Sequence, residues 1–350
     1  MKTLWYYFFK TIIRISLFFY FKKIKVVGRE NIPTKGALLF MVNHPNALMD
    51  PLIVAANNPR VQHFLVRAAA FKKPLIKKFL GTLNLMPIYR IRDGIKKLEK
   101  NQKIFEKCFS ILNNEKSLMI FPEGSHDKRR SIRPLSKGFS RIVFGALEAN
   151  PDLQIHIILV GLTYQNPSVY PTNVCVQYGK PILANDYYKI ESINSEIKQL
   201  KDAISSQLKS LSVHIPLDQN YQNTLDKLNK GNVNFIEVKE VNSMIESKII
   251  STRDRKPNLL KLLKPVIILN SIIPWLLWKY VESKNSEFEF IDTFRYGVST
   301  LAFCFFYLLQ TYIIIYFYNW KIGIIYLSLS IILILLYGKF HPTPAELTPE

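Results

Sequence analysis

The longest apolar runs lie towards the C-terminal end of the chain. Residues 298–318 contain 21 positions without a charged side chain. At about 1.5 Å per residue, a helix of that length spans a hydrocarbon core of roughly 30 Å. A second apolar run at 322–337 follows after a short turn. The pattern predicts a transmembrane helical hairpin within a membrane region at 259–340. The shorter run at 265–278, which Pro274 interrupts, is expected to be interfacial or re-entrant.

Residues 1–23 combine aromatic and aliphatic side chains with cations on one helical stripe. Lys10 and Arg14 interrupt the apolar stretch, and Lys22 and Lys23 follow it where a secretory signal would carry a small-residue cleavage site. This pattern predicts an amphipathic helix that lies in the membrane surface with its cations turned outward. A short transmembrane anchor and a signal peptide are the alternatives.

Between these two regions, in residues 24–214, short apolar runs alternate with helical patterns. The expected strands are 37–42, 85–89, 117–121, 155–162 and 174–178, and the expected helices are 51–56, 74–80, 94–113, 137–149 and 186–211. Alternation of this kind predicts an α/β fold, with helices covering the faces of a sheet. Residues 215–258 are rich in Asn, Lys and Glu without a clear period, and we expect a helical or loop linker there.

Composition and charge narrow the class of protein. Hydrophobic residues make up 48% of the 350 positions, which excludes disorder, and three cysteines are too few for a disulfide scaffold. The formal net charge is +21, yet residues 259–350 hold only seven of the 47 cations and six of the 26 acids. A basic body beside an apolar tail predicts a domain held on an anionic membrane surface, on the cytoplasmic face. The alternative, a non-catalytic membrane-surface or nucleic-acid-binding protein, lacks a recognisable nucleic-acid motif.

The segment that follows the expected strand at 37–42 carries the first candidate chemistry. Pro45 biases His44 away from helical dihedrals, so His44 ends its strand at the edge where α/β sheets bind ligands. Asp50 can return to the imidazole only through a compact turn, because a straight helix would rotate the two about 240° apart. A His–carboxylate pair makes a general base. The alternative is a turn histidine with an aspartate that caps the turn locally.

Basic side chains follow two other strands. Arg90 and Arg92 lie at the end of the strand at 85–89, and arginine can bind phosphate with two hydrogen bonds. The strand at 117–121 runs into a Pro-Glu-Gly turn, after which five cations occur within residues 128–137. These cations are candidates for phosphate binding; a surface ion pair and a solvated charged loop are the alternatives.

Taken together, these segments resemble the glycerolipid acyltransferase superfamily, the PlsC-like phosphate acyltransferases. The resemblance covers about residues 24–180 and implies a mixed sheet flanked by helices. The matching positions are His44 and Asp50 in the first block, Arg90 in the second, Phe121, Pro122, Glu123 and Gly124 in the third, and residues 160–163 in the fourth. Five residues separate the His from the Asp, as in a subgroup with the pattern HPN…DP. His126 and Thr163 stand where arginine and proline are usual, which bears on the identity of the acceptor.

The resemblance implies direct acyl transfer in phospholipid synthesis. His44 would deprotonate the hydroxyl of glycerol 3-phosphate or 1-acylglycerol 3-phosphate, which attacks an acyl thioester of coenzyme A or acyl-carrier protein. Glu123 and Gly124 would bind the glycerol portion and Arg90 the phosphate, with Arg133 and Lys137 as further phosphate candidates. The thioester is already activated, so neither a metal nor another cofactor is expected. A different lipid or amine acceptor is the alternative.

A metal hydrolase is a further alternative from another class. It would use His44, Asp50, Glu123 and His126 as ligands, but the sequence has no HExxH motif and no clustered histidine pair. The expected partners are therefore a phospholipid membrane, the thioester donor and the glycerol phosphate acceptor, without nucleic acid.

Overall fold

A mixed eight-stranded sheet forms the centre of the protein in the computed structural model, which describes residues 2–90, 94–189, 192–252, 258–285 and 290–343. The strand order is β1-β7-β6-β2-β5-β3-β4, and β8 also pairs with β6. Neighbouring strands are parallel except where β6 meets β7 and β8. The strands are β1 (Lys23–Val27), β2 (Ala37–Val42), β3 (Gln62–Arg67), β4 (Leu85–Ile88), β5 (Ser117–Ile120), β6 (Ile155–Tyr164), β7 (Asn173–Tyr178) and β8 (Ile182–Leu183).

The α/β prediction is confirmed, and each of the five expected strands is present. The apolar pattern did not predict β1, β3 and β8. β1 alternates cations with apolar residues at the edge of the sheet, and β3 begins with Gln62 and His63. Charged side chains are typical of edge strands, which must not pair with other chains. A search for apolar runs therefore passes over β1 at the edge, and it passes over β3 inside the sheet because that strand begins with polar residues.

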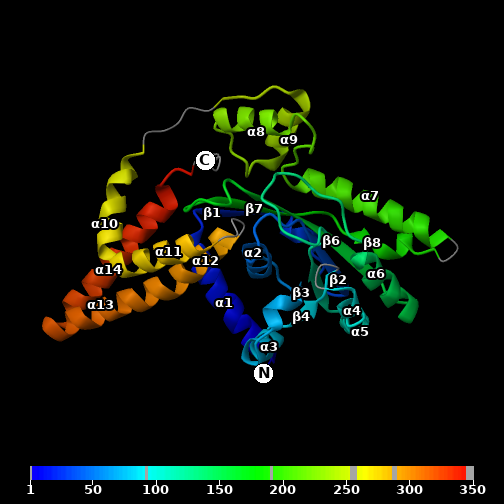
Figure 1. The fold of residues 1–350 in the computed structure, drawn as a ribbon, viewed down its shortest axis with the longest axis horizontal. Helices are drawn as coiled ribbons and strands as arrows, with labels where there is room; N and C mark the ends of the chain where they lie inside the picture. The colour runs from blue at the N-terminus through cyan, green and yellow to red at the C-terminus, as the bar shows by residue number, and fades with distance from the viewer. Residues whose placement is uncertain (1, 91–93, 190–191, 253–257, 286–289, 344–350) are drawn as a thin grey trace.

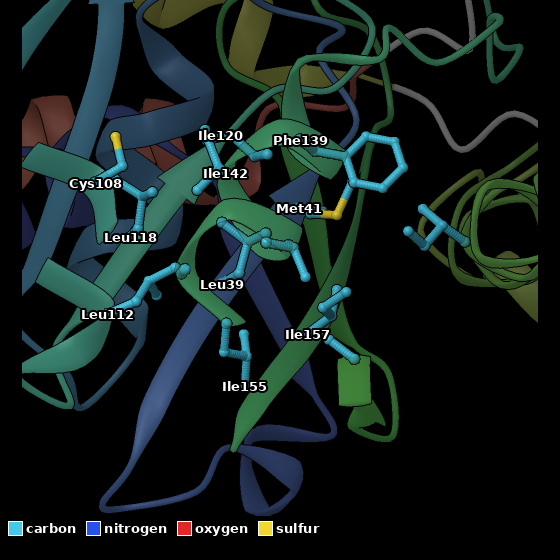
Figure 2. Close-up of a cluster of buried hydrophobic side chains, with 14 of the residues drawn as sticks. Leu39, Met41, Cys108, Leu112, Leu118, Ile120, Phe139, Ile142, Ile155 and Ile157 are labelled. Atoms are coloured by element: carbon cyan, nitrogen blue, oxygen red, sulfur yellow. The ribbon is translucent and has the colours of Figure 1, made fainter. Parts of the chain in front are cut away.

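Helices cover both faces of this sheet. On one face lie α5 (Asn101–Asn113), α6 (Gly138–Ala149) and α7 (Ile193–Leu211), with the short α4 (Ile95–Leu98) before them. The expected helix at 94–113 is therefore broken into two, and the expected helix from 186 begins with a turn of 3-10 helix at Ala184–Tyr187. Figure 2 shows part of the core on this face, formed by Leu39, Met41, Cys108, Leu112, Leu118, Ile120, Phe139, Ile142, Ile155 and Ile157.

On the opposite face, α1 (Lys2–Tyr20) and α2 (Met49–Asn57) pack against the alternate residues of β2. Leu38, Phe40 and Val42 belong to this second cluster, while Leu39 and Met41 belong to the first. β2 is thus buried on both faces, which explains its unbroken apolar sequence. α3 (Pro74–Thr82) lies near the N-terminal end of α1 (Figure 1). The helix expected at the N-terminus is present, and its position in a membrane surface stays a prediction.

Two helices occupy much of the segment at 215–258. α8 (Tyr221–Lys230) and α9 (Val238–Ser247) surround a small core of their own that includes Leu228, Phe235 and Val241. Of the two expectations for this segment, the structure has the helical one; residues 253–257 lie outside the described ranges. Figure 1 places α8 and α9 beside one end of α7.

The C-terminal region contains two helices that are long and apolar enough to cross a membrane. One runs from Ile291 to Phe317 through α12 (Ile291–Val298), a π-helical turn and α13 (Cys304–Phe317), and the other is α14 (Trp320–Phe340). They pack together as the predicted hairpin (Figure 1). The second is longer than the expected 322–337, because the Asn319 side chain caps it by accepting a hydrogen bond from the Ile322 N–H.

Before the hairpin, the chain bends sharply where an interfacial or re-entrant segment is expected. α10 (Leu263–Asn270) and α11 (Ile272–Lys284) meet at 95°. Both ends of the hairpin lie against the sheet domain. Asp292 near the start of α12 contacts Tyr20 of α1, and Lys339 at the end of α14 donates a hydrogen bond to the Phe21 carbonyl at 2.8 Å. The hairpin therefore returns to the side from which it leaves.

Candidate active site

His44 and Asp50 form the predicted pair at the carboxyl end of β2. The Nδ1 atom of His44 lies 2.7 Å from Oδ2 of Asp50. Because the carboxylate accepts, this contact assigns the proton to Nδ1 and leaves Nε2 as the basic nitrogen. The Asp50 side chain has no exposed surface, whereas 16% of the His44 side chain is exposed. The carboxylate is thus held inside the protein while the imidazole reaches a surface that substrate can approach.

The compact turn that this pairing requires is present. The backbone N–H of Met49 bonds to the Asn46 carbonyl at 2.9 Å, and α2 begins at Met49. Ala47 has φ of 34°, an uncommon value for a residue with a side chain. This turn folds the chain back within three residues, so that Asp50, in the first turn of α2, faces the imidazole.

Asp50 has two further hydrogen-bond donors. Its Oδ2 atom accepts the Asn46 N–H at 2.7 Å, and its Oδ1 atom accepts the Tyr164 hydroxyl at 2.7 Å. Burial, together with the charge of Asp50, raises the pKa of Tyr164 well above its usual value, so the phenol remains a donor. Three donors around one buried carboxylate hold it in a single orientation and offset its desolvation.

Glu123 reaches the same edge from the neighbouring strand. β2 and β5 are parallel neighbours, so their carboxyl ends lie side by side. The Oε1 atom of Glu123 accepts the His44 N–H at 3.3 Å, and its Oε2 atom accepts from Arg133 Nε at 2.7 Å. Burial raises the pKa of Glu123 above its usual value, although the Arg133 guanidinium and the His44 N–H act in the opposite direction. Glu123 thus belongs to the same hydrogen-bonded assembly as His44.

The other predicted binding residues are placed as follows. Gly124 adopts φ of 75°, which favours glycine in the turn after β5, and its carbonyl accepts from Arg90 Nη1 at 2.8 Å. Arg133 also donates to the Ser125 hydroxyl, at 2.7 Å, and to the Ser125 carbonyl. Lys137 is exposed at the start of α6, and within the described residues its side chain makes no hydrogen bond or ion pair with this assembly. The structure therefore brings together the predicted residues except Lys137.

Aromatic rings surround the imidazole. The Phe121 ring stacks on His44 with centroids 4.0 Å apart, and the His126 ring meets His44 edge-on at 5.6 Å. Phe290, just before α12, in turn contacts His126 at 4.9 Å. The Phe290 ring, which contacts His126 beside His44, therefore comes from the membrane region.

Three side chains of the site were not among the predicted residues. Asn46 lies within the HPN sequence, and Tyr164 directly follows the fourth block, so a closer examination of both blocks would have reached them. The sequence indicates Asp292 as a site residue less clearly, because the only sign is an acidic residue at the start of a long apolar helix. Across the described part of the chain, no group of three or more His, Cys, Asp or Glu side chains is placed to hold a metal ion.

Comparisons with known proteins find similarity in the part of the chain that contains His44, Asp50 and Glu123. Residues 23–163 match the family model described as "Acyltransferase". Glycerol-3-phosphate O-acyltransferase 1 of Saccharomyces cerevisiae is 29% identical over 115 residues, which cover 31% of this chain and 15% of that protein. The 1-acyl-sn-glycerol-3-phosphate acyltransferase of Borreliella burgdorferi is 29% identical over 126 residues, 36% of this chain and 48% of that protein.

This chain thus spans less than half the length of these curated relatives. Among solved structures, the 1-acyl-sn-glycerophosphate acyltransferase PlsC from Thermotoga maritima aligns with 16% identity and a TM-score of 0.37. That alignment covers 54% of this chain and 73% of that one. The family match includes the His44–Asp50 pair, Arg90 and the Glu123–Gly124 turn. Residues 23–163, which contain these side chains, are therefore similar to the acyltransferase family.

Proposed function

We propose that this protein is a membrane-bound O-acyltransferase. It transfers a fatty acyl group from a thioester of coenzyme A or acyl-carrier protein to glycerol 3-phosphate or 1-acylglycerol 3-phosphate. The observation that carries the proposal is the 2.7 Å contact between His44 and Asp50 at the carboxyl edge of the sheet. The acyltransferase relatives support the reaction type, and the acceptors that give those relatives their names support the two acceptors.

In the proposed reaction, Nε2 of His44 removes the proton from the acceptor hydroxyl as its oxygen attacks the thioester carbonyl. Asp50 stabilises the imidazolium that forms, since its carboxylate accepts the Nδ1–H. When the carbon–sulfur bond breaks, the proton on Nε2 passes to the departing thiolate. The products are an ester and a free thiol, and His44 returns to its neutral form.

The acceptor would bind between the turn after β5 and Arg90. The Arg90 guanidinium lies at the Gly124 carbonyl and can bind the phosphate, while the Glu123–Gly124 turn binds the glycerol portion. Arg133 makes three hydrogen bonds to Glu123 and Ser125. We therefore assign Arg133 mainly to holding Glu123, and we retain Lys137 as a possible outer phosphate contact.

The sheet domain would lie on the cytoplasmic face of the membrane. The two C-terminal helices are apolar enough to cross a bilayer, and both ends of their hairpin contact the sheet domain. The strongly basic residues 1–258 favour the cytoplasmic side by the positive-inside rule. In this orientation the site has direct access to soluble thioester donors and to lipid acceptors in the adjacent leaflet.

The test is acyl transfer by the purified full chain in phospholipid vesicles. Labelled acyl-CoA and labelled acyl-carrier protein are each offered with glycerol 3-phosphate, 1-acylglycerol 3-phosphate, a lipid acceptor without phosphate and an amine acceptor. We expect esterification of a phosphate-bearing acceptor. Transfer only to the acceptor without phosphate or to the amine would replace the proposed substrate class, and no transfer to any acceptor would contradict the function.

His44→Ala tests the assigned base. Loss of a general base lowers kcat by roughly 10²–10⁴-fold, so we expect transfer to be nearly abolished while the variant remains membrane-bound and folded. His63→Ala is a matched control, because His63 is also partly buried but bonds to the Ser117 carbonyl at the opposite end of β5. Wild-type turnover in His44→Ala would refute the assignment.

A further inference from the structure

Asp292 is a buried carboxylate near the start of the membrane hairpin. It lies in the first turn of α12, has no exposed surface, and begins a 27-residue helix that is otherwise mostly apolar. Burial of a carboxylate in such surroundings is costly unless hydrogen bonds and opposite charges compensate for it. The position of Asp292 therefore calls for a specific set of partners.

Those partners come from three parts of the chain. Oδ2 of Asp292 accepts from the Asn46 amide nitrogen at 2.8 Å, and Oδ1 accepts from the Tyr20 hydroxyl of α1. Arg295, one turn later in α12, places Nη1 3.6 Å from Oδ1. The Tyr20 contact docks the start of the hairpin on α1, whereas the Arg295 contact lies within α12. The contact with Asn46 is different, since it reaches the turn that holds the catalytic pair.

Asn46 connects the two carboxylates. Its side-chain amide donates to Asp292, and its backbone N–H donates to Oδ2 of Asp50, the same oxygen that faces His44. Asn46 is fully buried and precedes Ala47, whose φ of 34° is uncommon for a residue with a side chain. A fixed side chain at position 46 is therefore well placed to hold the strained turn in its closed form.

A second contact links the same segment to the site. Phe290 immediately precedes α12, and its ring meets His126, which in turn meets His44. The beginning of the hairpin is thus connected to the His44–Asp50 pair by two sets of contacts. One set is polar and includes Asn46, and the other is aromatic and includes His126. Both contacts come from beyond residues 23–163, the part that matches the family model.

We propose that Asp292 is a positioning residue for the His44–Asp50 pair: it holds Asn46 so that the backbone N–H of Asn46 stays on Asp50. The start of the membrane hairpin thereby completes the active site of the sheet domain. This inference rests on the proposed acyltransferase function for its kinetic consequences. The hydrogen-bonded connection itself does not depend on that function and can be tested separately.

The first experiment compares Asp292→Asn with Glu282→Gln in the full chain in vesicles. Glu282 is the matched control, because it is an acid of the same region whose side chain pairs with Lys279 on the surface of α11. Asp292→Asn replaces the charged acceptor by a neutral amide, which weakens the hydrogen bond from Asn46 even where the amide oxygen faces that side chain. We expect kcat to fall roughly 10–100-fold, as displaced catalytic groups cause, with acceptor KM little changed. Glu282→Gln should behave as wild type.

Tyr20→Phe separates positioning from docking. It removes the Tyr20 hydroxyl from Asp292 but leaves the contact between Asp292 and Asn46. If Asp292 only docks the hairpin, Tyr20→Phe and Asp292→Asn should reduce kcat equally. We expect a clearly smaller loss in Tyr20→Phe. Equal losses in the two variants, or wild-type kcat in Asp292→Asn, would overturn the proposal.

Asn46→Ala provides a second route if Asp292→Asn does not fold. It removes the amide and leaves Tyr20 and Arg295 on Asp292. We expect a loss of kcat similar to that in Asp292→Asn, and a double variant that loses little more than either single one. Wild-type kcat in Asn46→Ala would likewise overturn the proposal.

Hydrogen exchange supplies a readout that needs no activity. The amide of Asn46 is protected by Asp50, so a peptide covering residues 43–50 should exchange faster in Asp292→Asn than in wild type or Glu282→Gln. Unchanged exchange would contradict the positioning role. If wild type transfers no acyl group but exchange in this peptide increases in Asp292→Asn, the proposed function fails and the positioning contact stands.

Discussion

The Tyr164 hydroxyl lies 2.7 Å from Oδ1 of Asp50, on the oxygen that does not face His44. β6 supplies the tyrosine and α2 the aspartate, and these elements are far apart in the sequence. The carboxylate that orients the histidine is therefore itself oriented from a neighbouring strand. A change at Tyr164 therefore reaches His44 through Asp50.

Tyr164→Phe should lower kcat. Without the hydroxyl, Oδ1 of Asp50 loses a donor inside the protein, and the carboxylate that orients His44 is held less firmly. We expect kcat to fall roughly 10-fold with acceptor KM little changed. Tyr178→Phe is the control, since Tyr178 is equally buried but bonds to the Val54 carbonyl. Wild-type kcat in Tyr164→Phe would contradict this role.

Arg90→Ala should weaken binding of the acceptor more than it slows the chemical step. Arg90 donates to the Gly124 carbonyl and is assigned to the phosphate. We expect acceptor KM to rise roughly 10–100-fold, the loss typical of a charge-assisted hydrogen bond, with a smaller change in kcat.

Two further variants serve as references for Arg90→Ala. Arg141→Ala removes an exposed cation from α6 and should leave KM unchanged. Lys137→Ala should raise KM less than Arg90→Ala does, because Lys137 is exposed at the start of that helix. An acceptor KM in Arg90→Ala equal to that of wild type would count against the phosphate assignment.

His214 should make the folded protein less stable in mild acid. Its Nδ1 atom accepts the Ile132 N–H at 3.0 Å, and burial lowers the pKa of His214 from 6.5 to about 4. The unfolded chain therefore binds more protons than the folded chain between these values, and stability falls as pH drops through this window. We expect Tm to be lower at pH 5 than at pH 7.5.

His214→Gln keeps a neutral acceptor but cannot take up a proton at these pH values. The variant should show a smaller decrease in Tm between pH 7.5 and pH 5 than wild type, measured in the same vesicles. Comparing the two proteins removes the contributions of other titrating groups, including His63, whose pKa is also lowered by burial. Equal decreases in both proteins would rule out His214 as the cause.

The fold and the centre of the site could be predicted from local sequence. β2 and β6 are buried runs of apolar residues, and Pro45 prevents the strand from continuing after His44. The sequence therefore indicates both the end of β2 and the histidine side chain that stands there. The pairing of His44 with Asp50 depended on a compact turn. That turn uses an uncommon dihedral angle at Ala47, and the conformational preferences of the residues there do not predict this angle.

Other parts of the site depend on contacts between distant segments. Asp292 meets Asn46 across 246 positions and Tyr20 across 272, and periodicity along the chain carries no information about such pairs. The contacts of Arg133 are of the same kind, and its binding to phosphate stays a prediction. The proximity of Glu123 and Ser125, which occupy its guanidinium, appears only in the folded protein.

The return of the hairpin to the sheet domain has a consequence for lipid traffic. Within the described residues, the turn between α13 and α14 is the part of the hairpin farthest along the chain from either docked end. With both ends beside one domain, the lipid product of the proposed reaction would be delivered to the leaflet beneath that domain. Supply of the opposite leaflet would then require a separate flipping activity.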